Sequence, residues 1–207
     1  MKPKILFTTI LSIFLFTSCG IFRTKTVHDP RTHDEGVVIN GIRWATRNVD
    51  APGTFAPMPE SPGMLYQWNR KVAWNTTDRE VEGWDNSLPE GTKWYAENDP
   101  CPEGWRVPTR EELQSLYDSG SVWVTYNEIR GRLFGTAPNQ IFLPLVGWRL
   151  GGDGSLLAVG ATMYRSSTQF DSEHATSLGF FDSDFNYHIV VGADWRPIAS
   201  NIRCVAK

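Results

Sequence analysis

Residues 100–118, PCPEGWRVPTREELQSLYD, carry the clearest structural signal in the chain. Thr109 is a good helix N-cap residue, and Glu112, three positions later, completes a capping box. One apolar helix face follows from the spacing of Leu113, Leu116 and Tyr117. The stretch therefore predicts a helix over residues 109–118, which the serine and glycine at 119–120 bring to an end.

Upstream of this helix, residues 37–45 have the pattern of a β-hairpin. The apolar runs Val37–Ile39 and Ile42–Ala45 flank Asn40-Gly41. Asn-Gly readily adopts the positive φ angles of a type I′ turn, so we expect two short antiparallel strands here. The folded domain is therefore expected to begin near residue 36.

The segment between this hairpin and the helix predicts little regular structure. Residues 64–68 favour one short strand, and residues 69–100 place three tryptophans among turn-forming residues. These are Trp74, Trp84 and Trp94. We expect a long loop region that aromatic side chains hold in place.

Downstream of Gly135 the pattern changes to short apolar runs separated by turn residues. Six strands are predicted there, at residues 141–148, 156–159, 163–168, 176–181, 187–191 and 201–205. Gly151–Gly154 and Asp182–Asp184 are the expected turns. One early helix with many short strands and long loops predicts an α+β fold for a single domain over residues 36–207.

The N-terminus has the layout of a secretory signal peptide. Lys2 and Lys4 precede the uncharged run 5–16, which is shorter than the roughly 20 residues that a membrane-spanning helix needs. Residues 16–19, Phe-Thr-Ser-Cys, resemble a bacterial lipobox, which implies cleavage after residue 18 and a lipid on Cys19. An ordinary signal peptide with a chance cysteine is the alternative.

The residues after Cys19 predict a flexible tether over 19–35, because they are polar and lack periodicity. Gly20 stands where many inner-membrane lipoproteins carry an acidic residue, so we expect an outer-membrane lipoprotein, facing either the periplasm or the cell surface. His28, Asp29, His33 and Asp34 lie in this tether and are interpreted as solvated side chains rather than a metal site.

Charge and cysteine content narrow the class of protein further. Removal of residues 1–18 leaves 18 basic and 23 acidic residues, a balance that gives no reason to expect nucleic-acid binding. With Cys19 lipidated, Cys101 and Cys204 form an even pair in an oxidising compartment. We predict a Cys101–Cys204 disulfide, with two separate buried thiols as the alternative.

The segment from Cys101 to Leu113 resembles the Fibrobacter succinogenes major paralogous domain family, which is common in exported lipoproteins. Other segments agree with the family in the same order: 41–45 with 48–49, 66–68, 142–149, 164–168 and 202–205. The resemblance covers about residues 36–207 and implies the C-type-lectin-like fold shared with formylglycine-generating enzymes. Arg165 departs from the tryptophan that the family usually has.

No catalytic or cofactor-binding set stands out in the sequence. Formylglycine-generating enzymes need two reactive active-site cysteines, whereas Cys101 and Cys204 flank motifs that look structural. Residues 182–186 resemble the opening of a calcium loop, but Tyr187 replaces the required glycine and Ala193 the bidentate glutamate. We therefore expect no enzyme activity, no metal and no cofactor.

Aromatic residues beside polar groups on expected turns are the remaining candidates for a binding site. Such pairs suit sugars and peptides because they combine apolar and oriented polar contacts. The candidates are Trp148, Arg149, Asp153, Tyr164, Arg165, Asp194 and Trp195. We expect a lipid-anchored module that binds a glycan or protein at the cell envelope. A structural subunit of an envelope assembly is the alternative, and an enzyme of unfamiliar type is a third possibility.

Overall fold

The computed structural model describes residues 29–157, 160–182 and 189–207. The expected signal peptide, Cys19 and most of the tether lie outside the described residues, as do residues 183–186 of the turn that resembles a calcium loop. No helix in the described part of the chain is long and apolar enough to cross a bilayer.

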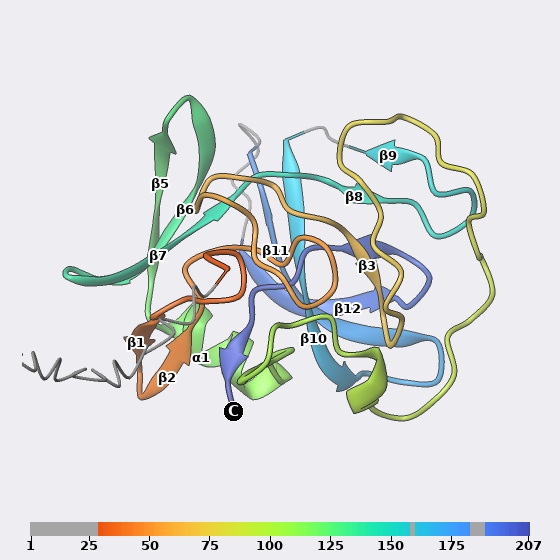
Figure 1. Ribbon diagram of the computed structural model, residues 1–207, viewed down its shortest axis with the longest axis horizontal. Helices are drawn as coiled ribbons and strands as arrows, with labels where there is room; N and C mark the ends of the chain where they lie inside the picture. The colour runs from red at the N-terminus through yellow and green to blue at the C-terminus, as the bar shows by residue number, and fades with distance from the viewer. Residues whose placement is uncertain (1–28, 158–159, 183–188) are drawn as a thin grey trace, which may run out of the picture.

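Short antiparallel strands and one α-helix make up the described structure (Figure 1). In chain order the elements are β1 Val37–Ile39, β2 Ile42–Trp44, β3 Tyr66–Gln67, the 3-10 helix η1 Ala96–Asn98, β4 Trp105–Arg106, α1 Arg110–Asp118, β5 Ser121–Tyr126, β6 Ile129–Thr136, β7 Asn139–Pro144, β8 Trp148–Arg149, β9 Leu156–Leu157, β10 Ala161–Gln169, β11 His174–Phe181, β12 Val190–Trp195, β13 Ala199–Ser200 and β14 Val205–Ala206. The expected α+β class agrees with this content, which is mainly β.

The strands form four small sheets with the orders β1-β2-β14-β4, β10-β11-β12, β3-β13-β8-β9 and β5-β6-β7. Figure 1 shows the β5-β6-β7 sheet at one end of the molecule and β8 with β9 at the other. The main apolar core lies between α1, β10 and β11, where Leu113, Leu116, Tyr164 and Phe180 are buried together.

The predicted helix is confirmed. Thr109 caps α1 by accepting a hydrogen bond from the Glu112 backbone N–H at 3.3 Å, and the Glu112 carboxylate accepts one from the Thr109 N–H at 2.8 Å. Arg106 of β4 reaches the same carboxylate at 2.6 Å. One short stretch of sequence therefore fixes both the start of the helix and its position against β4.

The hairpin of β1 and β2 and the disulfide are also confirmed. Asn40 and Gly41 have φ angles of 50° and 80°, as a type I′ turn requires. Cys101 and Cys204 form a disulfide between residues 103 positions apart in the sequence. It joins the segment before β4 to the segment before β14, and these two strands pair directly.

The expected loop region is confirmed as well. Residues 69–95 contain no named strand, and their tryptophans hold them to the rest of the domain. Trp74 packs on Trp84 with ring centroids 4.9 Å apart, and Trp94 packs edge-on against the buried Trp68. This segment lacks the ladder hydrogen bonds of a paired strand. Burial of the tryptophan rings stabilises it instead.

The structure differs from the predicted strands in three main places. The expected strand 141–148 divides into β7 and β8, because residues 145–147 turn between two sheets. The expected strand 201–205 is wrong over 201–204, where the backbone instead makes single bonds to several segments, such as Val49 N–H to the Ile202 carbonyl. The strands β5 and β6 were not predicted at all.

Four buried arginines connect loops that have no ladder of their own: Arg149, Arg165, Arg196 and Arg203. Each donates to backbone carbonyl oxygens from distant segments. Burial lowers the pKa of each guanidinium, although arginine keeps its charge in proteins. Their hydrogen bonds hold these loops in place, as pairing between strands does in other parts of the molecule.

Candidate functional site

Three of the seven residues expected to bind a ligand have no exposed surface. Tyr164 is fully buried, stacks on Phe180 and donates its hydroxyl to the Pro144 carbonyl at 3.0 Å. Burial raises the pKa of Tyr164 to about 12. The side chain is therefore part of the core, and the expectation of a ligand contact is corrected.

Arg149 and Arg165 are corrected for the same reason. The Arg149 guanidinium lies in the interior and donates to the Asn75, Asp78 and Gly154 carbonyls at 2.7–3.0 Å. The Arg165 guanidinium donates to the Ile198 carbonyl at 2.9 Å. Both are fully enclosed, so they hold loops together and offer no surface to a ligand.

The other four expected residues keep some accessible surface. Trp148 of β8 is half-buried, Asp153 is exposed in the turn after β8, and Asp194 and Trp195 end β12. Trp195 lies directly against Gly151, where an added Cβ would come within 2.4 Å of its ring. The structure thus brings Trp195 to the 150–154 turn.

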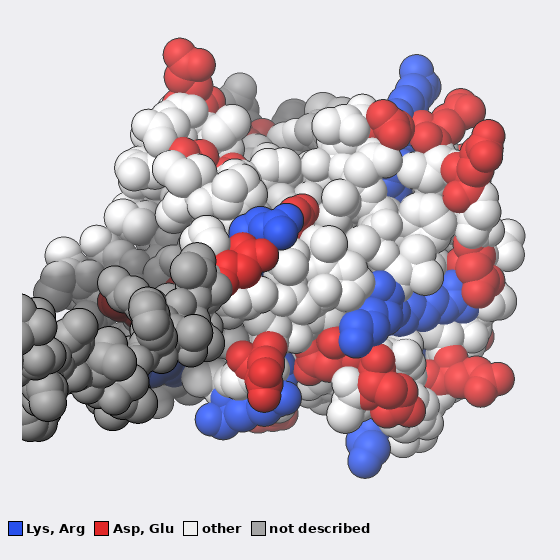
Figure 2. Space-filling view, viewed as in Figure 1, with Lys and Arg blue, Asp and Glu red and all other residues white. Residues whose placement is uncertain are grey.

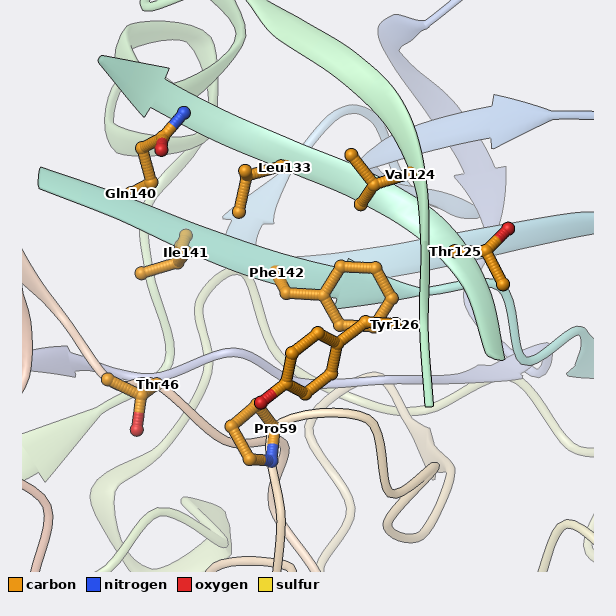
Figure 3. Close-up of a pocket in the computed structure, with 9 residues that line it drawn as sticks. All are labelled: Thr46, Pro59, Val124, Thr125, Tyr126, Leu133, Gln140, Ile141 and Phe142. Carbon is orange, nitrogen blue, oxygen red and sulfur yellow. The ribbon is translucent and has the colours of Figure 1, made fainter. Parts of the chain in front are cut away.

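A different feature has the geometry of a binding site. A cavity of about 400 Å³ lies between the β5-β6-β7 sheet and the segment 46–60 (Figure 3). We call it the hairpin cavity, and it is lined by Thr46, Pro59, Val124, Thr125, Tyr126, Leu133, Gln140, Ile141 and Phe142. Its volume falls in the range of small-ligand sites, and its lining is largely apolar.

Strand register explains why these side chains converge. Val122 pairs with Leu133, which pairs in turn with Phe142, so apolar residues from all three strands share one face of the sheet. Gly131 gives the Phe142 ring room, because a Cβ at residue 131 would approach that ring within 2.6 Å. The cavity floor therefore depends on a glycine in the middle of β6.

The tip of the β5–β6 hairpin is bonded to the segment 46–60 beside the cavity. Asn127 donates to the Glu60 Oε1 atom at 2.7 Å, and Figure 3 shows the Tyr126 ring directed toward Pro59. We call this pair of contacts the clasp. It joins the hairpin tip to the segment 46–60 next to two residues that line the cavity, Pro59 and Tyr126.

Sequence reasoning missed this site because it missed β5 and β6. Residues 121–126, SVWVTY, are rich in β-branched and aromatic side chains, which favour strands. Both turn residues, Asn127 and Glu128, have positive φ, but the usual Asn-Gly signal is absent. The composition of residues 121–126 was therefore the sequence signal that could have predicted β5.

A second depression, of about 330 Å³, is more polar. It is lined by Trp94, Ala96, Asp99, Arg106, Val107, Thr109, Ser167 and Lys207. Burial raises the pKa of Asp99, whose carboxylate accepts the Cys101 and Val107 backbone N–H groups at 2.9 and 3.2 Å. These bonds give Asp99 a structural role at the start of the 100–118 stretch.

Neither the charges on the face seen in Figure 2 nor the metal-binding groups of the described residues point to a competing site. On the face seen in Figure 2, acidic and basic side chains are interspersed, and much of the centre is uncharged. Within the residues that the structure describes, no group of three or more His, Cys, Asp or Glu side chains could hold a metal ion. The hairpin cavity is therefore our candidate site.

Comparisons with known proteins add no functional assignment. No protein-family model matches the chain, and no curated protein or solved structure matches it either. The function must be argued from the site itself.

Proposed function

We propose that the chain is an exported lipoprotein whose folded domain binds a ligand in the hairpin cavity without catalysing a reaction. The observation that carries the binding role is the cavity itself, which nine residues line and which has a volume of about 400 Å³. None of these side chains is a His, Cys, Lys, Asp or Glu, so the lining supports recognition better than acid–base or nucleophilic chemistry.

The export and lipid anchor are proposed from residues 1–19, with Cys19 as the lipidated residue and the outer membrane as the location. We further propose that the domain has the C-type-lectin-like fold. One helix, short antiparallel strands, a disulfide near the chain end and a long loop region support this assignment. Such a domain would display its cavity at the cell envelope to a glycan or protein.

The anchor is tested by mass spectrometry of the N-terminal peptide of the mature protein from the membrane fraction. The proposal predicts a peptide that begins at Cys19 with added acyl mass, and a Cys19→Ser variant that leaves the membrane. An unacylated peptide with unchanged membrane association would contradict it.

The binding role is tested by applying the full-length protein in detergent to glycan and peptide arrays. Val124→Phe fills the hairpin cavity with a side chain that still suits a strand, whereas Val190→Phe is the matched change on the exposed part of β12. We expect Val124→Phe to abolish binding and Val190→Phe to preserve it. Equal binding by both variants, or none by the wild type, would refute a site in the cavity.

A further inference from the structure

We infer that the ligand of the hairpin cavity is an extended peptide segment, which adds to the outer edge of β5 and places one large apolar side chain in the cavity. A basic group on the peptide, next to that side chain, pairs with Glu60. This inference rests on the proposed binding function and goes beyond it by choosing a peptide over a glycan.

The outer edge of β5 presents backbone N–H and C=O groups that do not bond to β6. The order β5-β6-β7 leaves β5 at one side of its sheet. The two-residue turn makes Tyr126 and Ile129 a hydrogen-bonded pair, so the alternating pattern directs the N–H and C=O groups of Thr125 and Trp123 outward. In the described part of the chain no backbone bond reaches these four groups.

The sequence of β5 also lacks the features that usually block pairing at an edge. SVWVTY contains no proline, no lysine and no other charged residue, and its six residues pair with β6 without a bulge. Natural proteins commonly protect such strands with charges, prolines or bulges. An unprotected edge of this length suits recognition of an extended peptide by strand addition.

Edge and cavity are parts of one surface. Val124, Thr125 and Tyr126 of the edge strand all line the hairpin cavity. In a β-strand every second side chain points to the same face. A peptide paired with β5 would therefore direct alternate side chains toward the cavity, where the apolar lining favours an aromatic or long aliphatic group.

The carboxylate of Glu60 is the reason to expect a positively charged group on the peptide. Its Oε1 atom accepts the bond from Asn127 in the clasp, but its Oε2 atom is buried without a hydrogen-bond partner among the described residues. A buried carboxylate oxygen without a donor is unfavourable. Glu128 adds a second acid in the adjacent turn, and no residue of the cavity lining is charged. A lysine or arginine on the peptide would supply the hydrogen-bond donor that the Glu60 carboxylate lacks.

The test is selection from a display library of random nine-residue peptides on the full-length protein in detergent, followed by anisotropy titration of an enriched peptide. We expect enriched sequences with a Phe, Trp, Leu or Met next to a Lys or Arg. Replacement of the basic residue by Glu should weaken binding roughly tenfold, the order expected for one charge-assisted hydrogen bond.

Two variants at one position separate edge pairing from side-chain effects. Thr125→Pro removes an outward N–H that β6 does not use, whereas Thr125→Ala keeps it. We expect about a tenfold loss of peptide affinity for the proline variant and less than about a twofold change for the alanine variant. Circular dichroism and the unfolding midpoint of each variant show whether it is folded.

The inference is overturned if no peptide is enriched, if the enriched peptides lack the apolar and basic pair, or if a folded Thr125→Pro variant binds as well as Thr125→Ala. Glycan-array binding that Val124→Phe abolishes, without any peptide binding, would retain the proposed function and reject the peptide. Sedimentation that shows a dimer lost in Thr125→Pro would identify a second copy as the occupant and also reject it.

Discussion

At the scale of single residues, the buried arginines explain why part of the expected site was misassigned. An arginine beside a tyrosine or a glycine-rich turn looks the same in sequence whether it meets a ligand or a carbonyl. Arg149 and Arg165 lie in such contexts, but their donors are used by the backbone of distant loops. Those contacts form only in the folded domain, so neither residue type nor local spacing could have revealed them.

Arg203 provides the clearest test of this role. Its guanidinium donates to Asn48 Oδ1 at 2.7 Å and to the Phe142 carbonyl at 3.0 Å, and all of it is buried. Arg203→Met leaves these acceptors without donors, so we predict a loss of about 3 kcal/mol in the free energy of unfolding. Urea denaturation measures it, with the exposed Arg79→Met as control. A loss no larger than that of the control would contradict the role.

Gly131 is the second residue whose identity the structure explains. A Cβ there would lie 2.4 Å from the Leu143 carbonyl oxygen and 2.6 Å from the Phe142 ring. We predict that Gly131→Ala lowers the free energy of unfolding by about 1–3 kcal/mol and displaces the Phe142 ring from the cavity floor. Gly192→Ala is the matched control, because its nearest neighbour would be an ordinary contact at 3.7 Å. Similar stability for both variants would refute the steric argument.

At the scale of elements, the sequence predicted those elements whose cap or turn is formed by neighbouring residues. The helix α1 and the β1–β2 hairpin each carry their own cap or turn within a few residues, so they could be predicted. The β5–β6 hairpin has a turn without glycine and faces that are apolar on both sides, because Trp123 packs on Phe180 while Val124 lines the cavity. Without a clear alternation of polar and apolar residues, the strand pattern was weak.

The cap of α1 gives a prediction with a definite pH dependence. Burial acts to raise the pKa of Glu112, but hydrogen bonds from Arg106 and Thr109 outweigh it and hold that pKa below its ordinary value of 4.5. Because the pKa is lowered in the fold, the stabilisation is complete above pH 4.5 and is lost as the pH falls through the lowered pKa.

We therefore predict that Glu112→Gln lowers the free energy of unfolding by about 1 kcal/mol at pH 7, the usual size of a helix-cap contribution. The difference from wild type should shrink steadily below pH 4.5. Chemical denaturation at a series of pH values measures this. A difference that is constant or grows toward acid would show that the carboxylate charge is not responsible.

At the scale of the whole molecule, the disulfide connects the middle of the folded domain to its C-terminal end. Cys101 lies in the 100–118 stretch ahead of β4 and α1, and the fully buried Cys204 precedes the last strand. The chain-entropy model gives about 4.7 kcal/mol for a loop near 100 residues. We predict that Cys101→Ala with Cys204→Ala lowers the free energy of unfolding by about 3–5 kcal/mol. Unfolding curves in urea that overlay the wild type would contradict this.

The overall α+β class and the disulfide could be predicted from sequence, whereas the site could not. The hairpin cavity combines a segment near residue 46, another near residue 59 and three strands between 121 and 144. Convergence of segments so far apart depends on strand register and on Gly131, neither of which has a local signature. Predictions based on aromatic residues beside turns instead pointed mainly to β8, the turn that follows it and the end of β12.

The position of the ligand is tested directly by methyl NMR spectra of the protein with and without the ligand selected on the arrays. If the hairpin cavity is the binding site, the largest shifts will be at the methyl groups of Val124, Leu133 and Ile141. Largest shifts at Leu150 and Leu156, beside the turn that Trp195 covers, would instead place the ligand at the surface expected from sequence and would exclude the hairpin cavity as its site.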